Sequence, residues 1–162
     1  NFMGFGSGVV VPGTGISLNN RGSGFTLEAG HPNRVAGSKR PFHTILPALL
    51  SRGGTPLCAL GVVGANMQPQ GHVQLISAME DLGLNPQAAL DMPRWRIADD
   101  GRIRLEADVA AQVAQGLLER GHDVEVRPAD DIEFGGAQMA WRHEGGWIAA
   151  SDPRRDGIAA GF

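Results

Sequence analysis

The residues best suited to chemistry lie between positions 61 and 72, where an apolar segment gives way to small and then polar side chains. Residues 57–63 predict a strand. This strand ends at Gly64 and Ala65, whose small side chains let a substrate approach the backbone closely. A strand, a small-residue turn and a helix start direct backbone N–H groups toward one point, an arrangement that binds developing negative charge. The alternative is a tight turn that needs small residues only for packing.

Other candidate groups give weaker signals. The glycines of residues 4–8 alternate along the chain without the Lys-Ser/Thr of a phosphate-binding loop, which indicates backbone packing. His43 reads either as a buried, hydrogen-bonded histidine or as a substrate contact. Ser7 and Ser23 lack the sequence context of an activated nucleophile. The histidines and acids never fall at metal-ligand spacing, so we expect no metal site and no cofactor.

The composition is typical of a folded protein. The length of 162 residues predicts a single domain over residues 1–162, and 42% hydrophobic with 19% charged residues excludes a disordered protein. The net charge of −3 argues against a general nucleic-acid binder. Cys58 lies in the apolar run and, as the single cysteine of the sequence, has no partner for an intrachain disulfide. No apolar stretch approaches the roughly 18 residues of a membrane span.

The elements that must position the turn follow from hydrophobic pattern and turn chemistry. Residues 9–11 and 16–18 predict a hairpin or a broken pair of strands, and residues 28–41 a long irregular connection. Residues 45–50 predict a strand that pairs with residues 57–63 as an antiparallel hairpin.

Helices and further strands alternate after the turn. The first predicted helix has an apolar face of Val73, Ile76, Met79 and Leu82. Gly83 should end it, Asn85 should cap a short second helix, and residues 108–120 form the third. Further short strands are predicted at 94–97, 102–105, 124–126, 138–141 and 147–150. The pattern predicts an α/β (α+β) chain with mostly antiparallel strands and about three helices.

Several short motifs occur in a fixed order along the chain. They are Phe5-Gly6-Ser7-Gly8, Leu18-Asn19-Asn20, Lys39-Arg40-Pro41, Gly64-Ala65, Pro93-Arg94 and Ala150-Ser151-Asp152-Pro153-Arg154. Taken together, they resemble the carboxyl-terminal part of the small subunit of the gamma-glutamyltransferase family. The resemblance implies an N-terminal-nucleophile hydrolase, an αββα sandwich of two sheets that is incomplete without the upstream chain.

The same resemblance implies a self-processing precursor. Autoproteolysis exposes a Thr at the amino terminus of the small subunit, and that Thr attacks a gamma-glutamyl amide to form an acyl-enzyme. The chain opens without an initiator Met, as expected for the product of a cut within a larger precursor. The resemblance implies that the large subunit and the amino-terminal segment carrying the Thr lie upstream as its partners. The implied setting is the bacterial cytoplasm or envelope, without a choice between them.

Family roles carry over onto several positions of this sequence. The oxyanion donors, a Gly-Gly pair in the family, fall on Gly64 and Ala65, and donation from Ala65 is expected if its φ stays negative. Two Ser that hold the substrate α-carboxylate fall on His43 and Thr44. A substrate-binding Asn corresponds approximately to Asn1.

One departure from the family pattern bears on specificity. The Gln and Asp that recognise the substrate α-amino group fall on Arg21 and Gly24. The carboxylate is therefore lost at Gly24, and a guanidinium is gained at Arg21. Together with the motif at residues 67–72, this resembles a divergent branch that includes cephalosporin and glutaryl acylases. We therefore expect an amidase for gamma-glutamyl or glutaryl-like amides and a poor glutathione hydrolase. The alternative is a non-catalytic binding or structural subunit derived from the same family.

Overall fold

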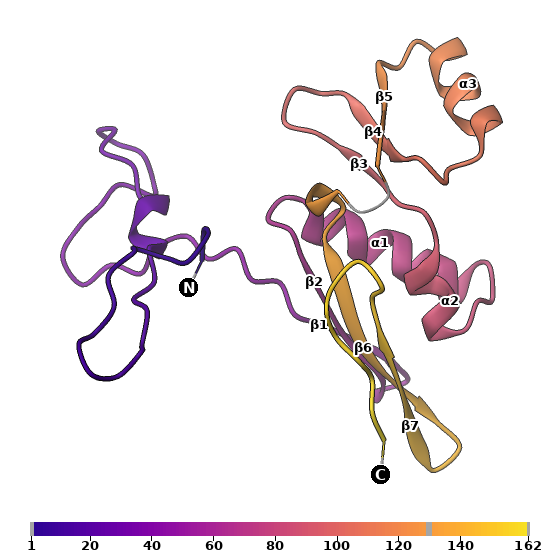
Figure 1. Cartoon of the computed structure of the whole chain (residues 1–162), viewed down its shortest axis with the longest axis horizontal. Helices are drawn as coiled ribbons and strands as arrows, with labels where there is room; N and C mark the ends of the chain where they lie inside the picture. Colours follow the sequence, from indigo (N-terminus) through magenta and orange to yellow (C-terminus); the bar gives the residue numbers. More distant parts are fainter. Residues whose placement is uncertain (1, 129–130, 162) are drawn as a thin grey trace. The chain divides into compact units, whose positions relative to one another are not determined.

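A computed structural model describes residues 2–128 and 131–161 of the chain, which form two compact units, Asn1–Thr44 and Ile45–Phe162 (Figure 1). Each unit is described by itself. The single domain expected over residues 1–162 stays a prediction.

The first unit is built mainly of turns. Its one regular element among the described residues is a short 3₁₀ helix, η1 (Arg21–Gly24). The two predicted strands of this region meet at a single bridge between Val10 and Ser17, with backbone hydrogen bonds from Val11 to Ile16 and from Leu18 to Val9. The broken strand pair predicted here is confirmed.

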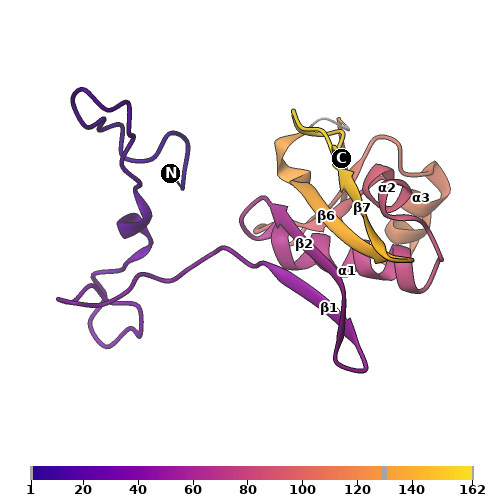
Figure 2. The ribbon, with the colours of Figure 1, turned by 90° about the horizontal axis from the view of Figure 1, so that it is seen from below.

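The second unit contains a four-stranded antiparallel sheet. Its strands are β1 (Ala48–Arg52), β2 (Thr55–Val63), β6 (Gly136–His143) and β7 (Gly146–Ser151), in the order β1-β2-β6-β7 (Figure 2). Both hairpins predicted from turn chemistry, β1-β2 and β6-β7, are confirmed. β2 and β6, far apart in sequence, pair in the middle of the sheet and hold the strand that leads into the candidate turn.

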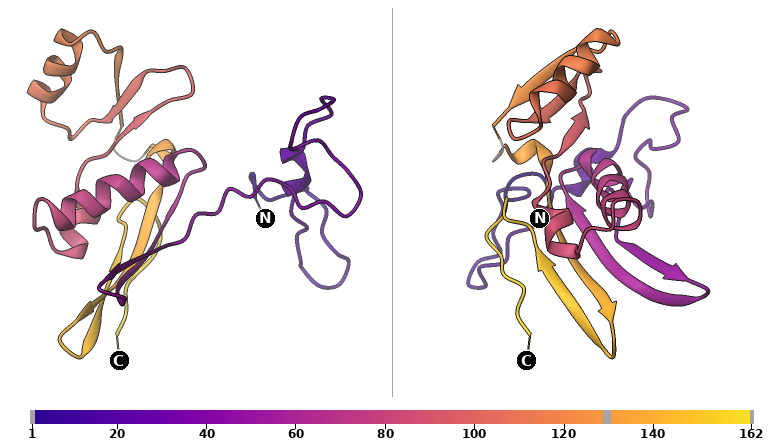
Figure 3. Two further views of the ribbon diagram at one scale, coloured as in Figure 1. Left: turned by 180° about the vertical axis from the view of Figure 1, so that it is seen from behind. Right: turned by 90° about the vertical axis from the view of Figure 1, so that its right-hand side faces the viewer.

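Helices α1 (Met67–Glu80) and α2 (Pro86–Asp91) cover one face of this sheet (Figure 3). Cys58, Leu60 and Val62 of β2 point toward the helices and are buried, whereas the residues between them are not. Each fully buried side chain of this size stabilises the fold by roughly 1.5–3 kcal/mol. β2 is therefore buried on one face, and the chain supplies one helix layer and one sheet of the predicted sandwich.

The predicted apolar face of α1 is partly wrong. Val73 and Leu82 are 60% and 63% exposed, whereas Leu75 and Met79 are buried. The cause lies at Gly71, because a Cβ added there would lie 2.9 Å from Val62 Cγ1. The helix thus approaches β2 at a glycine, and this close approach decides which side chains face the sheet.

A second, smaller sheet follows α2. It contains β3 (Trp95–Ile97), β4 (Ile103–Glu106) and β5 (Val124–Arg127), with β3-β4 antiparallel and β4-β5 parallel. Helix α3 (Ala111–Glu119) connects β4 to β5 and begins three residues later than the predicted start at residue 108. A 3₁₀ turn, η2 (Ile132–Phe134), precedes β6. In the described ranges no helix is long and apolar enough to cross a membrane.

Candidate active site

The turn between β2 and α1 has two backbone amides without partners among the described residues. The carbonyl oxygens of Gly64 and Ala65 accept hydrogen bonds from Met67 and Gln68, at 2.9 and 3.1 Å, and so begin the helix. Neither the Gly64 N–H nor the Ala65 N–H donates a hydrogen bond to any group in the described part of the chain. Partial positive charge at the amino end of α1 favours an anion beside these donors.

The expectation of a negative φ at Ala65 is wrong. Ala65 has φ +49°, in the left-handed region, and Gly64 has φ +127°. This geometry directs both carbonyls into the first turn of α1, so the two N–H groups remain unpaired. For a residue with a Cβ the left-handed conformation costs roughly 1–2 kcal/mol. The role of both residues as oxyanion donors stays a prediction.

Gly135, between η2 and β6, contacts the turn, and sequence reasoning missed it. A Cβ added to Gly135, which has φ +73°, would lie 2.2 Å from the Val63 carbonyl oxygen. A Cβ added to Gly64 would lie 3.1 Å from Gly135 Cα. Only glycine fits at both positions, so the close contact of two backbones fixes the end of β2. The Gly135-Gly136 pair was the available sequence signal.

A polar pocket of about 370 Å³ opens at the turn. Its lining residues come from the turn, from β3, β4 and the loop between them, and from η2: Gly64, Ala65, Asn66, Arg96, Ala98, Asp99, Asp100, Arg104 and Glu133. Arg104 is paired with Glu125 and Glu133, and Arg96 donates to the Glu133 backbone oxygen. Two arginines and three carboxylates line the wall, so a net negative charge remains beside the two amides.

Two predicted substrate-binding residues lie together in the first unit. Arg21 Nη1 donates to Thr44 Oγ1 at 3.0 Å, and the Arg21 guanidinium carbon lies 4.2 Å from the centre of the Phe2 ring. Both side chains are half-buried. The ring and the hydroxyl hold the guanidinium in place, as an anion-binding group requires.

The remaining predicted residues are less informative. His43 is exposed, so the interpretation as a buried histidine is wrong; the side chain of a residue in an irregular segment has no sheet to bury it. Asn1 lies outside the described residues. Among those described, no group of three His, Cys, Asp or Glu side chains gathers as a metal site would require.

A buried ionic cluster joins two of the motifs. Asp152 accepts hydrogen bonds from Arg94 Nη2 at 2.5 Å, from the Ala137 N–H at 2.8 Å and from the Arg154 N–H at 3.0 Å. Arg154 also binds Glu106. Burial opposes ionisation of Asp152, but the Arg154 N–H, the Arg94 charge and the Ala137 N–H hold its pKa below the ordinary value. The Asx-type turn predicted at residues 151–154 is confirmed, and its role is structural.

Comparison with known proteins identifies relatives over nearly the whole chain. The chain is 38% identical over 164 residues to the glutathione hydrolase-like YwrD proenzyme of Bacillus subtilis, and 36% identical over 164 residues to the oxamate amidohydrolase proenzyme of Klebsiella pneumoniae. Each alignment covers 98% of this chain and 31% of the relative, so the chain spans about a third of these relatives' length.

A solved structure extends the likeness to three dimensions. The crystal structure of cephalosporin acylase from Bacillus halodurans superposes with a TM-score of 0.91 at 45% identity, covering 99% of this chain and 30% of that one. The predicted fold and the acylase-like branch are thereby confirmed. The family model described as gamma-glutamyltranspeptidase matches residues 1–162, and this chain therefore belongs to the gamma-glutamyltranspeptidase family.

Proposed function

We propose that the mature protein containing this chain is an amide hydrolase or acyl transferase of the N-terminal-nucleophile class. The observation that carries the proposal is the pair of amides at Gly64 and Ala65, unpartnered within the described ranges, at the amino end of a helix and beside a pocket. Relatives named as an amidohydrolase, glutathione hydrolases and acylases support amide chemistry. The large subunit and the amino-terminal segment of the same precursor complete the enzyme.

In the proposed reaction, an upstream Thr hydroxyl attacks the amide carbonyl and its proton passes to the α-amino group of that Thr. The carbonyl oxygen becomes an oxyanion, which accepts hydrogen bonds from the Gly64 and Ala65 N–H groups. The amine leaves with the transferred proton, giving an ester between the acyl group and the Thr. Water or an acceptor amine then attacks this ester. Loss of one such donor typically costs about 10²–10³ in kcat.

The proposed acyl group carries a carboxylate but no neighbouring ammonium. Arg21, held by Thr44 and by the Phe2 ring, offers a guanidinium that matches a carboxylate and repels an ammonium. The named activity of one relative agrees, because oxamate has a free carboxylate and no ammonium. His43 and Asn1 are proposed to complete the acyl pocket.

Kinetics of the full mature enzyme on glutaryl and gamma-glutamyl p-nitroanilide test this specificity. We expect a higher kcat/KM for the glutaryl compound, and we expect Arg21→Gln to reduce the ratio of the two values by at least about tenfold, the loss of one charge-assisted hydrogen bond. Arg34→Gln, at an exposed arginine of the same unit, is the matched control. An unchanged ratio in Arg21→Gln would show that Arg21 does not set the preference.

The competing proposal is a non-catalytic subunit derived from the family. Amino-terminal sequencing and intact-mass analysis of the purified mature protein distinguish the two. A Thr, Ser or Cys at the new amino terminus supports the enzyme. Any other residue there, or an unprocessed precursor, supports the non-catalytic subunit.

A further inference from the structure

Three side-chain amides on α1 and the residue before it bond β3 or the loop that follows it. Asn66, Gln70 and Gln74 are spaced four residues apart, so they lie on one face of the helix. Asn66 Nδ2 donates to Asp99 Oδ1 at 3.1 Å. We call these three residues the amide ladder.

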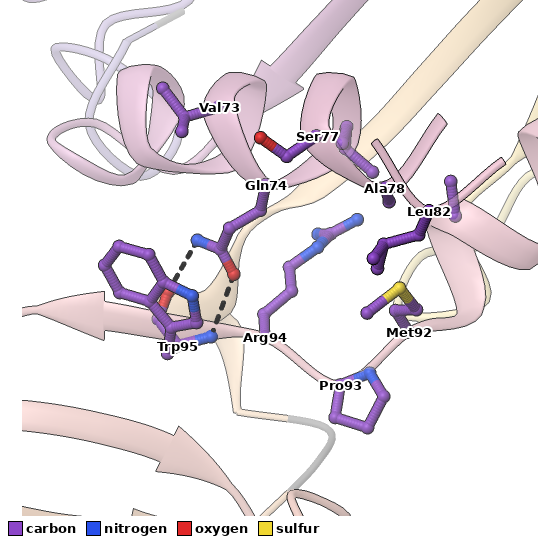
Figure 4. A pocket seen from close by; sticks show the side chains of 11 residues that line it. Val73, Gln74, Ser77, Ala78, Leu82, Met92, Pro93, Arg94 and Trp95 are labelled. Atoms are coloured by element: carbon purple, nitrogen blue, oxygen red, sulfur yellow. Dashed lines mark hydrogen bonds between the residues drawn. The ribbon is translucent and has the colours of Figure 1, made fainter. Parts of the chain in front are cut away.

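The two glutamines pair with β3 as another strand would. Gln74 Oε1 accepts from the Trp95 N–H at 3.0 Å, and its Nε2 donates to the Trp95 carbonyl oxygen at 2.8 Å (Figure 4). Gln70 Oε1 accepts from the Ile97 N–H at 2.7 Å, and its Nε2 donates to the Ile97 carbonyl oxygen at 3.2 Å. Because β3 is an edge strand, these bonds satisfy backbone groups that would otherwise be unpaired.

Gln70 makes one further bond that links the ladder to the candidate turn. Its Nε2 also donates to the Asn66 carbonyl oxygen at 3.1 Å. Asn66 directly follows Ala65, so one side chain ties the peptide that leaves the turn to the edge of β3. Gln74 donates instead to the Gln70 carbonyl oxygen at 3.1 Å, one helical turn farther from the oxyanion donors.

We propose that Gln70 is a positioning residue for the oxyanion turn, acting through Asn66 and β3. This inference rests on the proposed function. Ala65 has a strained φ, and in the described part of the chain the N–H groups of the turn donate no hydrogen bond, so the orientation of these N–H groups depends on the residues at the two ends of the turn. The contact with Gly135 fixes Val63, the residue before the turn, and the bond from Gln70 fixes Asn66, the residue after it.

The expected effect falls on the chemical step. Oxyanion donors act on charge that develops in the transition state, so a misplaced donor lowers kcat and leaves KM nearly unchanged. A displacement of about 1 Å can cost on the order of a hundredfold in rate. For a turn still held at its entry, we expect a loss in kcat of about tenfold.

Steady-state kinetics on the preferred anilide, corrected for the processed fraction by intact mass, test the proposal. Gln70→Met removes all of its bonds and should lower kcat about tenfold with KM within about twofold. Gln70→Glu keeps an acceptor for the Ile97 N–H but cannot donate to the Asn66 oxygen, and it should lower kcat similarly. Gln74→Met is the matched control, since it removes equivalent bonds to Trp95, and it should keep kcat within about twofold.

The outcomes separate the two proposals. Equal losses in the Gln70 and Gln74 variants, or wild-type kcat in both Gln70 variants, would overturn the positioning role while the enzyme proposal stands. A fully processed wild-type protein that hydrolyses neither anilide would overturn the proposed function and this inference together. If Gln70→Met does not fold, Gln70→Glu decides alone.

Discussion

Substitution of Gly135 by Ala tests whether its close contact with Val63 positions the candidate turn. The added Cβ would lie 2.2 Å from the Val63 carbonyl oxygen, about 1 Å inside the shortest ordinary C···O contact of roughly 3.3 Å. Other atoms are close as well, with Val62 Cγ1 at 3.3 Å and Met67 Cγ at 3.4 Å. Because backbone and core atoms surround the new methyl group, either residue 135 or the end of β2 must move.

Two terms contribute to the loss of stability. The left-handed φ costs about 1–2 kcal/mol for a residue with a Cβ, and overpacking adds about 1–3 kcal/mol. We therefore expect Gly135→Ala to reduce the free energy of unfolding by about 2–5 kcal/mol. Because Val63 directly precedes Gly64, a shift of about 1 Å also moves the oxyanion donors and should lower kcat about a hundredfold.

Gly145→Ala is the matched control. Gly145 has φ +83° in the β6-β7 turn, and a Cβ added there meets no atom within 4 Å. It should lose only the backbone term, about 1–2 kcal/mol, and keep kcat. Urea denaturation and steady-state kinetics of the mature enzyme measure both quantities. Equal destabilisation of the two variants together with wild-type kcat in Gly135→Ala would refute the close-contact argument.

Three further predictions follow from buried or strained groups. Because the pKa of Asp152 is lowered in the folded state, its ionisation stabilises the protein above about pH 4, and this stabilisation is lost as pH falls through the folded pKa. Asp152→Asn should therefore make stability depend less on pH in the acid range, and it should cost about 3–5 kcal/mol at neutral pH. Urea denaturation from pH 3 to 7 measures both effects. Burial raises the pKa of Cys58 to about 11, so a thiol reagent at pH 8 should label Cys58 only in the unfolded protein, and rapid labelling of the native enzyme would contradict its burial. Ala65→Gly relieves a left-handed φ while keeping the backbone donor, so it should keep kcat within about twofold. Ala65→Val places a β-branched side chain at the same φ and should lower both stability and kcat. Equal kinetics in the two variants would argue against a strained turn.

Local turn chemistry made much of the fold predictable from sequence. The β1-β2 hairpin follows from Gly53 and Gly54, both of which have positive φ. The second helix follows from Asn85, whose side chain accepts the Ala88 N–H at 2.9 Å. In these cases residues a few positions apart decide the structure, so a sequence pattern is sufficient.

Features that depend on distant partners were not predictable. The buried face of α1 depends on the approach of Gly71 to Val62, which the spacing of apolar residues does not encode. At the candidate site, small residues indicated the position of the turn. The contact from Gly135 and the bond from Gln70 to Ile97, 27 residues along the chain, depend on how the elements pack.

The buried ionic cluster links parts of the chain that would otherwise behave separately. Arg94 lies directly before β3 and Glu106 ends β4. Asp152 follows β7 and accepts a hydrogen bond from the Ala137 N–H near the start of β6. Since these charges are shielded from solvent, added salt screens them little. Neither sheet can open without exposing an unpaired ion from the other. The two sheets should therefore exchange their amide hydrogens as one cooperative unit, with the same opening free energy in β4 and β6.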